Sequence, residues 1–255
     1  AWVILYIHRW LTAPLQLSDG TLVERVRGVP QGGVVSCVLS NLFLHYVFDA
    51  WMKRNHPDKP WCRYADDGLV HCESREQAES LLSELQHRFE ECGLELHPDK
   101  TKIVYCKDDN RKEKYKETKF DFLGYTFCGR MARKRNTDEL FISFSPAVSK
   151  QSLKAMRAKT RQSNIRNRTD MSLEEIAKWY NPILNGWINY YGCYHRSGLN
   201  PMLRHFNLSL MAWAMRKYQK MSRNKARAAK FIKGISERQP SLFAHWKIGM
   251  VGGFA

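Results

Sequence analysis

The spacing of apolar residues in the first part of the chain changes between helical and strand-like periods. Residues 1–12 are mostly apolar and fit either a helix or a buried strand. Turn residues at 18–20 and the alternating pattern of 21–28 predict a hairpin. Residues 34–54 predict a long, largely buried helix. Its inner side is expected to comprise Leu39, Leu42, Phe43, Tyr46, Val47 and Trp51.

The next segment, residues 61–73, consists of two short apolar runs on either side of a tight turn. Ser74 and Gln77 have the spacing of a capping box for a following helix, which Gly93 ends. Further strands are expected at 94–98, 101–106 and 120–127, with a charged, solvated loop at 107–118. Helices and hairpins in this order predict an α+β domain in which helices pack on an antiparallel sheet.

From about residue 146 the apolar period becomes helical throughout. Ser172 with Glu175 forms a second capping box, and Pro201 suits the first turn of a helix. We therefore expect two domains, an α+β domain at 1–145 and an all-α domain at 146–255. The three amphipathic segments of the second domain are 152–162, 172–192 and 201–221.

Charge is distributed unevenly along the chain, whose net charge is +16. Residues 1–99 contain 9 Lys and Arg against 14 Asp and Glu, whereas residues 100–255 contain 32 against 11. A basic half of this kind usually contacts a polyanion, most often nucleic acid. The alternative is that these basic residues only keep the surface soluble and bind no polyanion.

Cysteine usage and hydropathy exclude several classes of protein. The seven cysteines are scattered singly, and the absence of a CxxC pair argues against a zinc knuckle. Such a set predicts reduced thiols and a cytoplasmic location. No apolar run approaches the roughly 18 residues of a membrane span, so no membrane partner is expected. The apolar opening residues lack the basic leader and the cleavage site of a signal peptide. Separately, the start at Ala instead of Met suggests a fragment.

Two adjacent aspartates, Asp66 and Asp67, interrupt the apolar segment 61–73. Neighbouring side chains of a regular strand face opposite ways, but at a hairpin tip both can point to the same open side. Two carboxylates this close repel each other, and a bound divalent cation would relieve the repulsion. Mg²⁺ prefers such oxygen ligands. An acidic turn in water is the alternative, and spacing alone leaves both open.

Five segments of the chain, taken together, resemble the ordered motifs of one enzyme family. Tyr64–Asp67 (YADD) resembles the YxDD box of reverse transcriptases, and Arg27–Ser36 resembles the PQG segment that precedes it. Gly93–Lys102 resembles the next segment with its lysine, and Phe122–Tyr125 (FLGY) resembles the primer grip. Leu184–Gly192 resembles the maturase (domain X) signature. By this resemblance the chain is identified as a member of the group II intron reverse transcriptases/maturases.

The resemblance implies a reverse-transcriptase palm followed by a helical thumb and maturase region. It also implies an RNA-directed DNA polymerase that uses two Mg²⁺ ions, with Asp66 and Asp67 as the metal-binding pair. The residues that match the nucleotide-binding positions are Gln31, Gly32, Tyr64 and Lys100. Those that match the primer grip are Leu123, Gly124 and Tyr125. A surface lysine is the less favoured alternative for Lys100. The FLGY segment could equally be a core hairpin, and we expect Phe122 and Leu123 to belong to the core.

The implied partners are group II intron RNA, an RNA template with a DNA primer, and dNTPs, and a homodimer is left open. Basic residues of the second half can neutralise RNA phosphates. The candidates are Arg133, Lys134, Arg135, Arg157, Lys159, Arg161, Arg166 and Arg168. Aromatic residues near them could stack on unpaired bases. At helical spacing such residues are more often core, which is our expectation for Trp187 and Tyr191.

The sequence departs from the family pattern upstream of the PQG segment. The family's palm carries a further aspartate there, whereas this chain offers only Asp19, in a predicted turn, and Glu24. We therefore expect an N-terminally truncated chain without the fingers and the first palm strand. The retained YADD favours an enzyme, and the missing aspartate favours a non-enzymatic RNA-binding splicing factor with a vestigial palm. The maturase-like segment argues against a reverse transcriptase unrelated to introns.

Overall fold

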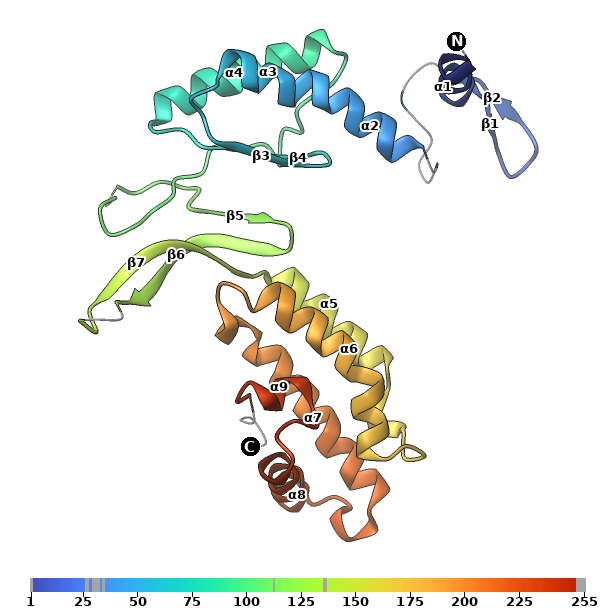
Figure 1. Cartoon of the computed structure of the whole chain (residues 1–255), viewed down its shortest axis with the longest axis vertical. Helices are drawn as coiled ribbons and strands as arrows, with labels where there is room; N and C mark the ends of the chain where they lie inside the picture. Colours follow the sequence, from blue (N-terminus) through green and yellow to red (C-terminus); the bar gives the residue numbers. More distant parts are fainter. Residues whose placement is uncertain are drawn as a thin grey trace. The chain divides into compact units, whose positions relative to one another are not determined.

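The structure is a computed structural model that describes residues 2–25, 28, 33, 35–111, 113–134 and 137–250 (Figure 1). The chain separates into two compact units, residues 1–103 and 104–255. This division by packing places the FLGY hairpin in the same unit as the C-terminal helices. The functional boundary between residues 145 and 146 stays a prediction.

The first unit begins with helix α1 (Trp2–Thr12) and a hairpin of two short strands, β1 (Leu15–Gln16) and β2 (Leu22–Val23). The predicted hairpin is therefore confirmed, with shorter strands than the pattern indicates. Residues 1–12 had fitted a helix or a buried strand, and the described part is a helix without a buried residue. The Arg25 guanidinium joins the two elements by donating hydrogen bonds to the carbonyls of Trp10 and Ala13.

The long helix predicted over 34–54 is divided into α2 (Ser36–Leu44), a π-helical segment (His45–Asp49) and α3 (Ala50–Asn55). Part of its predicted inner side is wrong, because Leu42, Phe43 and Tyr46 are exposed. The buried side chains are Val47, Phe48 and Met52. The core of this unit lies along α3 and the following helix, so the part of the helix before the π-helical segment extends beyond it. The wider π turn also shifts the face that follows.

The aspartate pair lies in a hairpin of β3 (Trp61–Tyr64) and β4 (Asp67–Val70). Helices α3 and α4 (Arg75–Glu91) cover one face of this hairpin (Figure 1). The Phe48 and Trp61 rings meet edge to face with their centroids 5.4 Å apart, and both belong to the small core around Met52 and Leu81. The hairpin is thereby fixed on two helices by its packed face.

Both ends of α4 follow the sequence prediction in outline. The Ser74 hydroxyl caps the helix by accepting from the Gln77 backbone N–H at 3.2 Å. In a complete capping box, Gln77 would accept from the backbone N–H of Ser74. Here Gln77 Oε1 accepts from the backbone N–H of the preceding residue, Glu73, instead. At the other end Gly93 has a φ of 69°, and the N–H of Leu94 donates to the Phe89 carbonyl, as in a Schellman motif.

The strands predicted at 94–98 and 101–106 are wrong, because the described residues between Gly93 and Thr118 form no helix or strand. Their backbone groups make separate hydrogen bonds instead of a ladder. Tyr105 donates its N–H to the Glu117 carbonyl, and Asp109 donates to that of Ile142. An apolar run becomes a strand only where a neighbouring strand pairs with it over several residues.

The second unit combines one antiparallel sheet with a bundle of helices. The sheet has the order β5 (Lys119–Phe122), β6 (Tyr125–Arg133) and β7 (Leu140–Val148). The three predicted helices are present as α5 (Lys150–Gln162), α6 (Leu173–Tyr191) and α7 (Asn200–Lys217), with the Ser172–Glu175 capping box formed. Helices α8 (Lys225–Arg238) and α9 (Ala244–Lys247) had not been predicted. The observed mixture of small antiparallel sheets and helices confirms the α+β class.

The larger hydrophobic core lies in this second unit and is rich in aromatic residues. The Tyr180 and Phe206 rings stack with centroids 4.9 Å apart, and the Tyr180 and Thr160 hydroxyls are hydrogen-bonded at 3.0 Å. Trp187 and Tyr191 are half-buried and pack against this core. All seven cysteines are free. Within the described residues, no helix has the length and apolar character required to span a membrane.

The burial of His245 predicts that the stability of this core depends on pH. Its side chain is completely buried, Nε2 lies 2.7 Å from Asn207 Oδ1, and burial lowers its pKa to about 3. The unfolded chain takes up the proton near pH 6.5, so the stability is fully present above that pH and is lost as the pH falls towards 3. Between pH 7.5 and 5 we expect a loss of about 2 kcal/mol in the free energy of unfolding.

Urea unfolding at both pH values tests this in the natural chain, His245→Gln and His87→Gln. The His245→Gln chain should lose most of the pH difference, because it lacks the buried imidazole. His87→Gln is the control, since that imidazole is exposed beside Glu91. Equal pH dependence in all three chains would contradict the assignment to His245.

Candidate active site and nucleic-acid interface

The two aspartates lie at the tip of the β3–β4 hairpin. Tyr64 pairs with Asp67, so only Ala65 and Asp66 connect the two strands. Arg63 lies on the half-buried face of β3, whereas Tyr64 and Asp67 are exposed, and so is Asp66. Neither aspartate carboxylate has a hydrogen bond or ion pair with the described residues. Both are therefore available to an external ligand.

A divalent cation fits the chemistry of this tip, because adjacent, solvent-accessible carboxylates offer the hard oxygen ligands that Mg²⁺ takes. The fit is incomplete. Over the part of the chain that the structure describes, no group of three His, Cys, Asp or Glu side chains is placed to hold a metal ion. The two aspartates alone could therefore supply only part of a coordination shell.

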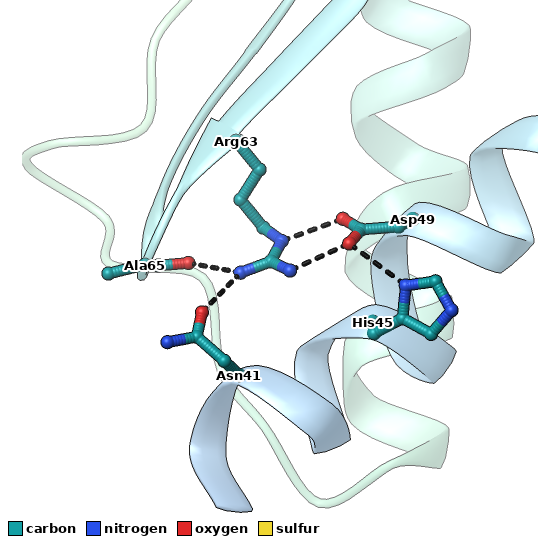
Figure 2. Close-up of polar contacts among 5 residues, drawn as sticks. All are labelled: Asn41, His45, Asp49, Arg63 and Ala65. Carbon is teal, nitrogen blue, oxygen red and sulfur yellow. Dashed lines mark hydrogen bonds and ion pairs between the residues drawn. The ribbon is translucent and has the colours of Figure 1, made fainter. Parts of the chain in front are cut away.

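A polar network behind the hairpin tip had not been predicted from the sequence (Figure 2). Arg63 donates from Nε and Nη2 to the two carboxylate oxygens of Asp49, each at 2.7 Å. Its Nη1 donates to Asn41 Oδ1 at 3.0 Å and to the Ala65 carbonyl at 2.7 Å. His45 Nδ1 lies 3.3 Å from Asp49 Oδ2. The Arg63 guanidinium lowers the pKa of Asp49, so this carboxyl is charged at neutral pH.

The other predicted nucleotide-binding residues are found in different places. Tyr64 shares the exposed face of the hairpin with Asp67, and 63% of its surface is accessible. Lys100 lies on an exposed turn after α4, where its backbone N–H donates to the His97 carbonyl. Gln31 and Gly32 lie outside the described residues. The hairpin thus brings Tyr64 together with the aspartates. Their proximity to Lys100, Gln31 and Gly32 stays a prediction.

The predicted primer grip is the two-residue turn between β5 and β6. Leu123 and Gly124 have φ values of 49° and 78°, the pattern of a type I′ hairpin. Leucine rarely adopts such a conformation, which is strained for a side chain with a Cβ. The expectation of a buried Leu123 is wrong, since 36% of its surface is accessible. Phe122 is half-buried, because strand alternation places it on the same face of β5 as Phe120, opposite the exposed Lys119 and Asp121.

This turn is fixed by the maturase-like segment of α6, a contact that had not been predicted. The Tyr190 hydroxyl donates to the Leu123 carbonyl at 3.0 Å. The buried Tyr125 hydroxyl donates in return to the Tyr190 carbonyl, and burial raises the pKa of Tyr125 to about 12. From α5, the Ser152 hydroxyl donates to the Gly124 carbonyl at 3.0 Å. Two motifs that lie about 65 residues apart therefore form one structural element.

Substitution of Gly124 tests how tightly this turn is packed. A Cβ at Gly124 would lie 2.8 Å from the Tyr191 hydroxyl and 2.9 Å from Ser152 Oγ, in addition to the strain of a positive φ. We expect Gly124→Ala to lower the free energy of unfolding by about 2–3 kcal/mol in urea denaturation. Gly249→Ala is the matched control, because Gly249 has a φ of 81° with open space around its Cβ position. Equal losses in the two variants would argue against close packing at the turn.

The predicted RNA-binding residues fall into two groups with different surroundings. Arg133 and Lys134, at the end of β6, form surface ion pairs with Asp138 and Glu139 at 3.5 and 3.0 Å. Arg135 lies outside the described residues. Surface pairs of this kind are weak, but they reduce the positive charge that the hairpin presents.

The second group lies on and after α5. Lys159, Arg161, Arg166 and Arg168 are exposed, and Arg157 is half-buried. Burial, and then the charges of Arg161 and Arg157, lower the pKa of His205 on the neighbouring helix α7. A potential that disfavours a third positive charge favours a phosphate. The Arg168 guanidinium lies over the exposed Trp179 ring, 5.8 Å from its centroid.

Comparisons with known proteins agree with this arrangement. Residues 1–127 match the family model described as reverse transcriptase (RNA-dependent DNA polymerase). Residues 153–231 match the model of the group II intron maturase-specific domain. A search of curated proteins gave no match.

The two matches lie in the order that the motifs predict, and each includes its own motifs. The aspartate hairpin and the FLGY turn fall within the first, and the Tyr190 segment falls within the second. Reverse transcriptases generally use divalent metal ions, and the pair of domains implies nucleic acids, including intron RNA, as partners. The chain therefore belongs to the group II intron reverse transcriptases/maturases, RNA-directed DNA polymerases that act in intron splicing and mobility.

Proposed function

We propose that Asp66 and Asp67 bind the Mg²⁺ ions of RNA-directed DNA synthesis in this chain. The observation that carries the proposal is the pair of exposed carboxylates at the tip of a well-anchored hairpin, which have no partner among the described residues. Bound Mg²⁺ supplies activation of the primer 3′-hydroxyl and stabilisation of the leaving pyrophosphate. The protein's own part is to present both carboxylates on one fixed turn.

The incoming dNTP is bound, in this proposal, by Gln31, Gly32, Tyr64 and Lys100. Tyr64 shares the exposed hairpin face with Asp67, which places its ring next to one of the proposed metal ligands. The Lys100 ammonium has no ion pair within the described residues and can offset negative charge on a triphosphate.

The primer end is bound by the Leu123–Gly124 turn together with Tyr125. The carbonyls of both turn residues accept hydrogen bonds from side chains of α5 and α6, so the turn presents a fixed backbone to the DNA primer on its RNA template. Such pre-organisation lowers the cost of binding.

The basic residues around α5 are proposed to bind the phosphates of group II intron RNA. A cytoplasmic location, a homodimer and a functional boundary at 145/146 stay predictions that belong to this proposal.

Metal binding tests the proposal directly. Two carboxylates give an incomplete site, so we expect the 255-residue chain to bind Mn²⁺, a spectroscopic substitute for Mg²⁺, with a dissociation constant of roughly 1 mM. Electron paramagnetic resonance of free Mn²⁺ measures this affinity. Asp66→Asn and Asp67→Asn should each weaken it several-fold.

Asp58→Asn is the matched control, because Asp58 is an exposed aspartate just before the same hairpin and forms its ion pair with the adjacent Lys59. The same Mn²⁺ affinity in all three variants would contradict the metal role. That outcome would favour the alternative function, a non-enzymatic RNA-binding splicing factor, for which the incomplete ligand set is the supporting observation.

A further inference from the structure

We propose that Arg63 is a positioning residue that fixes the backbone of the Ala65–Asp66 turn. It acts through the Arg63 clamp, which we define as Arg63 with its three partners, the Asp49 carboxylate, the Asn41 side chain and the Ala65 carbonyl (Figure 2). The inference rests on the proposed metal role of Asp66 and Asp67, because it explains how their turn is kept in one conformation.

The clamp uses most of the hydrogen-bonding capacity of the guanidinium. Nε and Nη2 contact the two Asp49 oxygens in a bidentate arrangement, and Nη1 contacts Asn41 and Ala65. The side chains of Arg63 and Asp49 are only 11% and 18% exposed, so water competes weakly for these bonds. Charge-assisted, bidentate pairs are among the strongest and most directional hydrogen bonds in proteins.

The turn requires such a contact because of its own backbone. Ala65 has a φ of 53°, a left-handed conformation that costs an alanine free energy. Its carbonyl belongs to the peptide group that joins it to Asp66, and Arg63 donates to this carbonyl at 2.7 Å. The bond therefore fixes the peptide plane from which the Asp66 backbone starts. If Arg63 were replaced, the Asp66 backbone could sample other turn conformations.

The clamp is anchored on the helix behind the hairpin. Asn41 comes from α2, where its Nδ2 donates to the Cys37 carbonyl at 3.0 Å. Asp49 is the last residue of the π-helical segment and is also approached by His45. Helical segments with π geometry are frequent at functional sites, where the extra residue redirects a side chain. Here the π-helical segment ends at Asp49, the residue whose carboxylate Arg63 binds.

A lysine cannot reproduce this geometry. Its ammonium is a point charge that can pair with Asp49, but it lacks the planar fork that also reaches Asn41 and the Ala65 carbonyl. The clamp therefore predicts different results for ion pairing and for turn positioning when Arg63 is replaced. If Arg63 served only as an ion-pair partner of Asp49, Arg63→Lys would preserve that role. If Arg63 fixes the turn, Arg63→Lys would leave the turn as mobile as Arg63→Gln does.

Hydrogen exchange of residues 61–70, followed by mass spectrometry in the full chain, measures the turn directly. We expect exchange to accelerate about tenfold in both Arg63→Gln and Arg63→Lys. Arg75→Gln is the matched control, because it breaks an exposed Arg75–Glu79 pair of the same 2.7 Å length in the same unit. Its exchange over 61–70 should equal that of the natural chain. If Arg63→Gln does not fold, Asn41→Ala removes one partner of the clamp and should give a smaller acceleration.

Mn²⁺ affinity, measured on the same variants, separates this inference from the function on which it rests. We expect Arg63→Lys to weaken Mn²⁺ binding several-fold while the urea midpoint changes little. Unchanged exchange at 61–70 in both Arg63 variants, or full rescue of exchange by lysine, would overturn the clamp. Faster exchange, combined with Mn²⁺ binding that is insensitive to Asp66→Asn and Asp67→Asn, would leave Arg63 as the residue that fixes the turn and refute the metal role instead.

Discussion

Primer extension on an RNA template should fall by about 10³-fold or more when Asp66 or Asp67 is replaced by alanine, since a metal site contributes several kcal/mol to transition-state stabilisation. The assay uses a labelled DNA primer, Mg²⁺ and a chimera that adds the fingers and first palm strand of another family member. This addition supplies the further carboxylate that the family pattern carries and that the described residues do not provide around the two aspartates. Full activity of the chimera after Asp66→Ala would show that the motif has been misinterpreted.

Two comparisons make this experiment specific. Asp58→Ala in the same chimera removes an exposed aspartate upstream of the hairpin and should leave extension unchanged. The 255-residue chain without the addition should extend the primer only weakly, because two carboxylates hold a cation poorly. Robust extension by that chain would mean that two carboxylates suffice here. RNA binding should survive the alanine substitutions, because the proposed phosphate contacts lie in the other unit.

Local features of the fold followed well from the sequence. The Ser74 and Ser172 caps, the Gly93 helix end and the position of the aspartate turn each depend on a few neighbouring residues. Turn and capping chemistry acts over such short distances, so a single sequence contains the information. The helices α5, α6 and α7 were predictable for a similar reason, since each buries a continuous apolar stripe.

Features that depend on distant partners were not predictable in this way. The run 101–106 has the apolar pattern of a strand, yet it pairs with no strand over several residues. The π-helical segment His45–Asp49 leaves no signal in the apolar period, and it changes which side chains are buried. Strand formation and burial depend on the neighbouring strands and helices in the folded chain, and a single sequence does not show which elements become neighbours.

The candidate site shows the same limit. Motif order indicated Asp66, Asp67 and the FLGY turn as candidates, but it gave no indication of the side chains that fix them. Arg63 was simply the residue before the tyrosine of YADD, and Tyr190 was one of several aromatic residues in a predicted helix. Their roles emerge only where the Arg63 clamp and the Tyr190–Leu123 hydrogen bond are seen in three dimensions.

The second large effect is expected in RNA binding. Arg157 and Arg161 lie one turn apart on α5, and burial, followed by the charges of these two residues, lowers the pKa of His205 on the neighbouring helix α7. Neither makes an ion pair within the described residues, so charge reversal would remove the proposed phosphate contacts without breaking a salt bridge. We expect the natural chain to lose about 10³-fold in affinity for structured RNA between roughly 50 and 200 mM salt. Filter binding or fluorescence anisotropy measures this dependence.

The double variant Arg157→Glu, Arg161→Glu should bind RNA much more weakly than the natural chain, and its salt slope should decrease by about two. The control reverses Lys53 and Arg54, two exposed cations at the end of α3 without ion pairs in the described part of the chain. That control changes the net charge by the same amount but lies in the first unit. A similar loss in both double variants would mean that overall charge governs binding. A loss confined to the α5 variant would locate the RNA on the second unit, which also contains the FLGY turn and Tyr190.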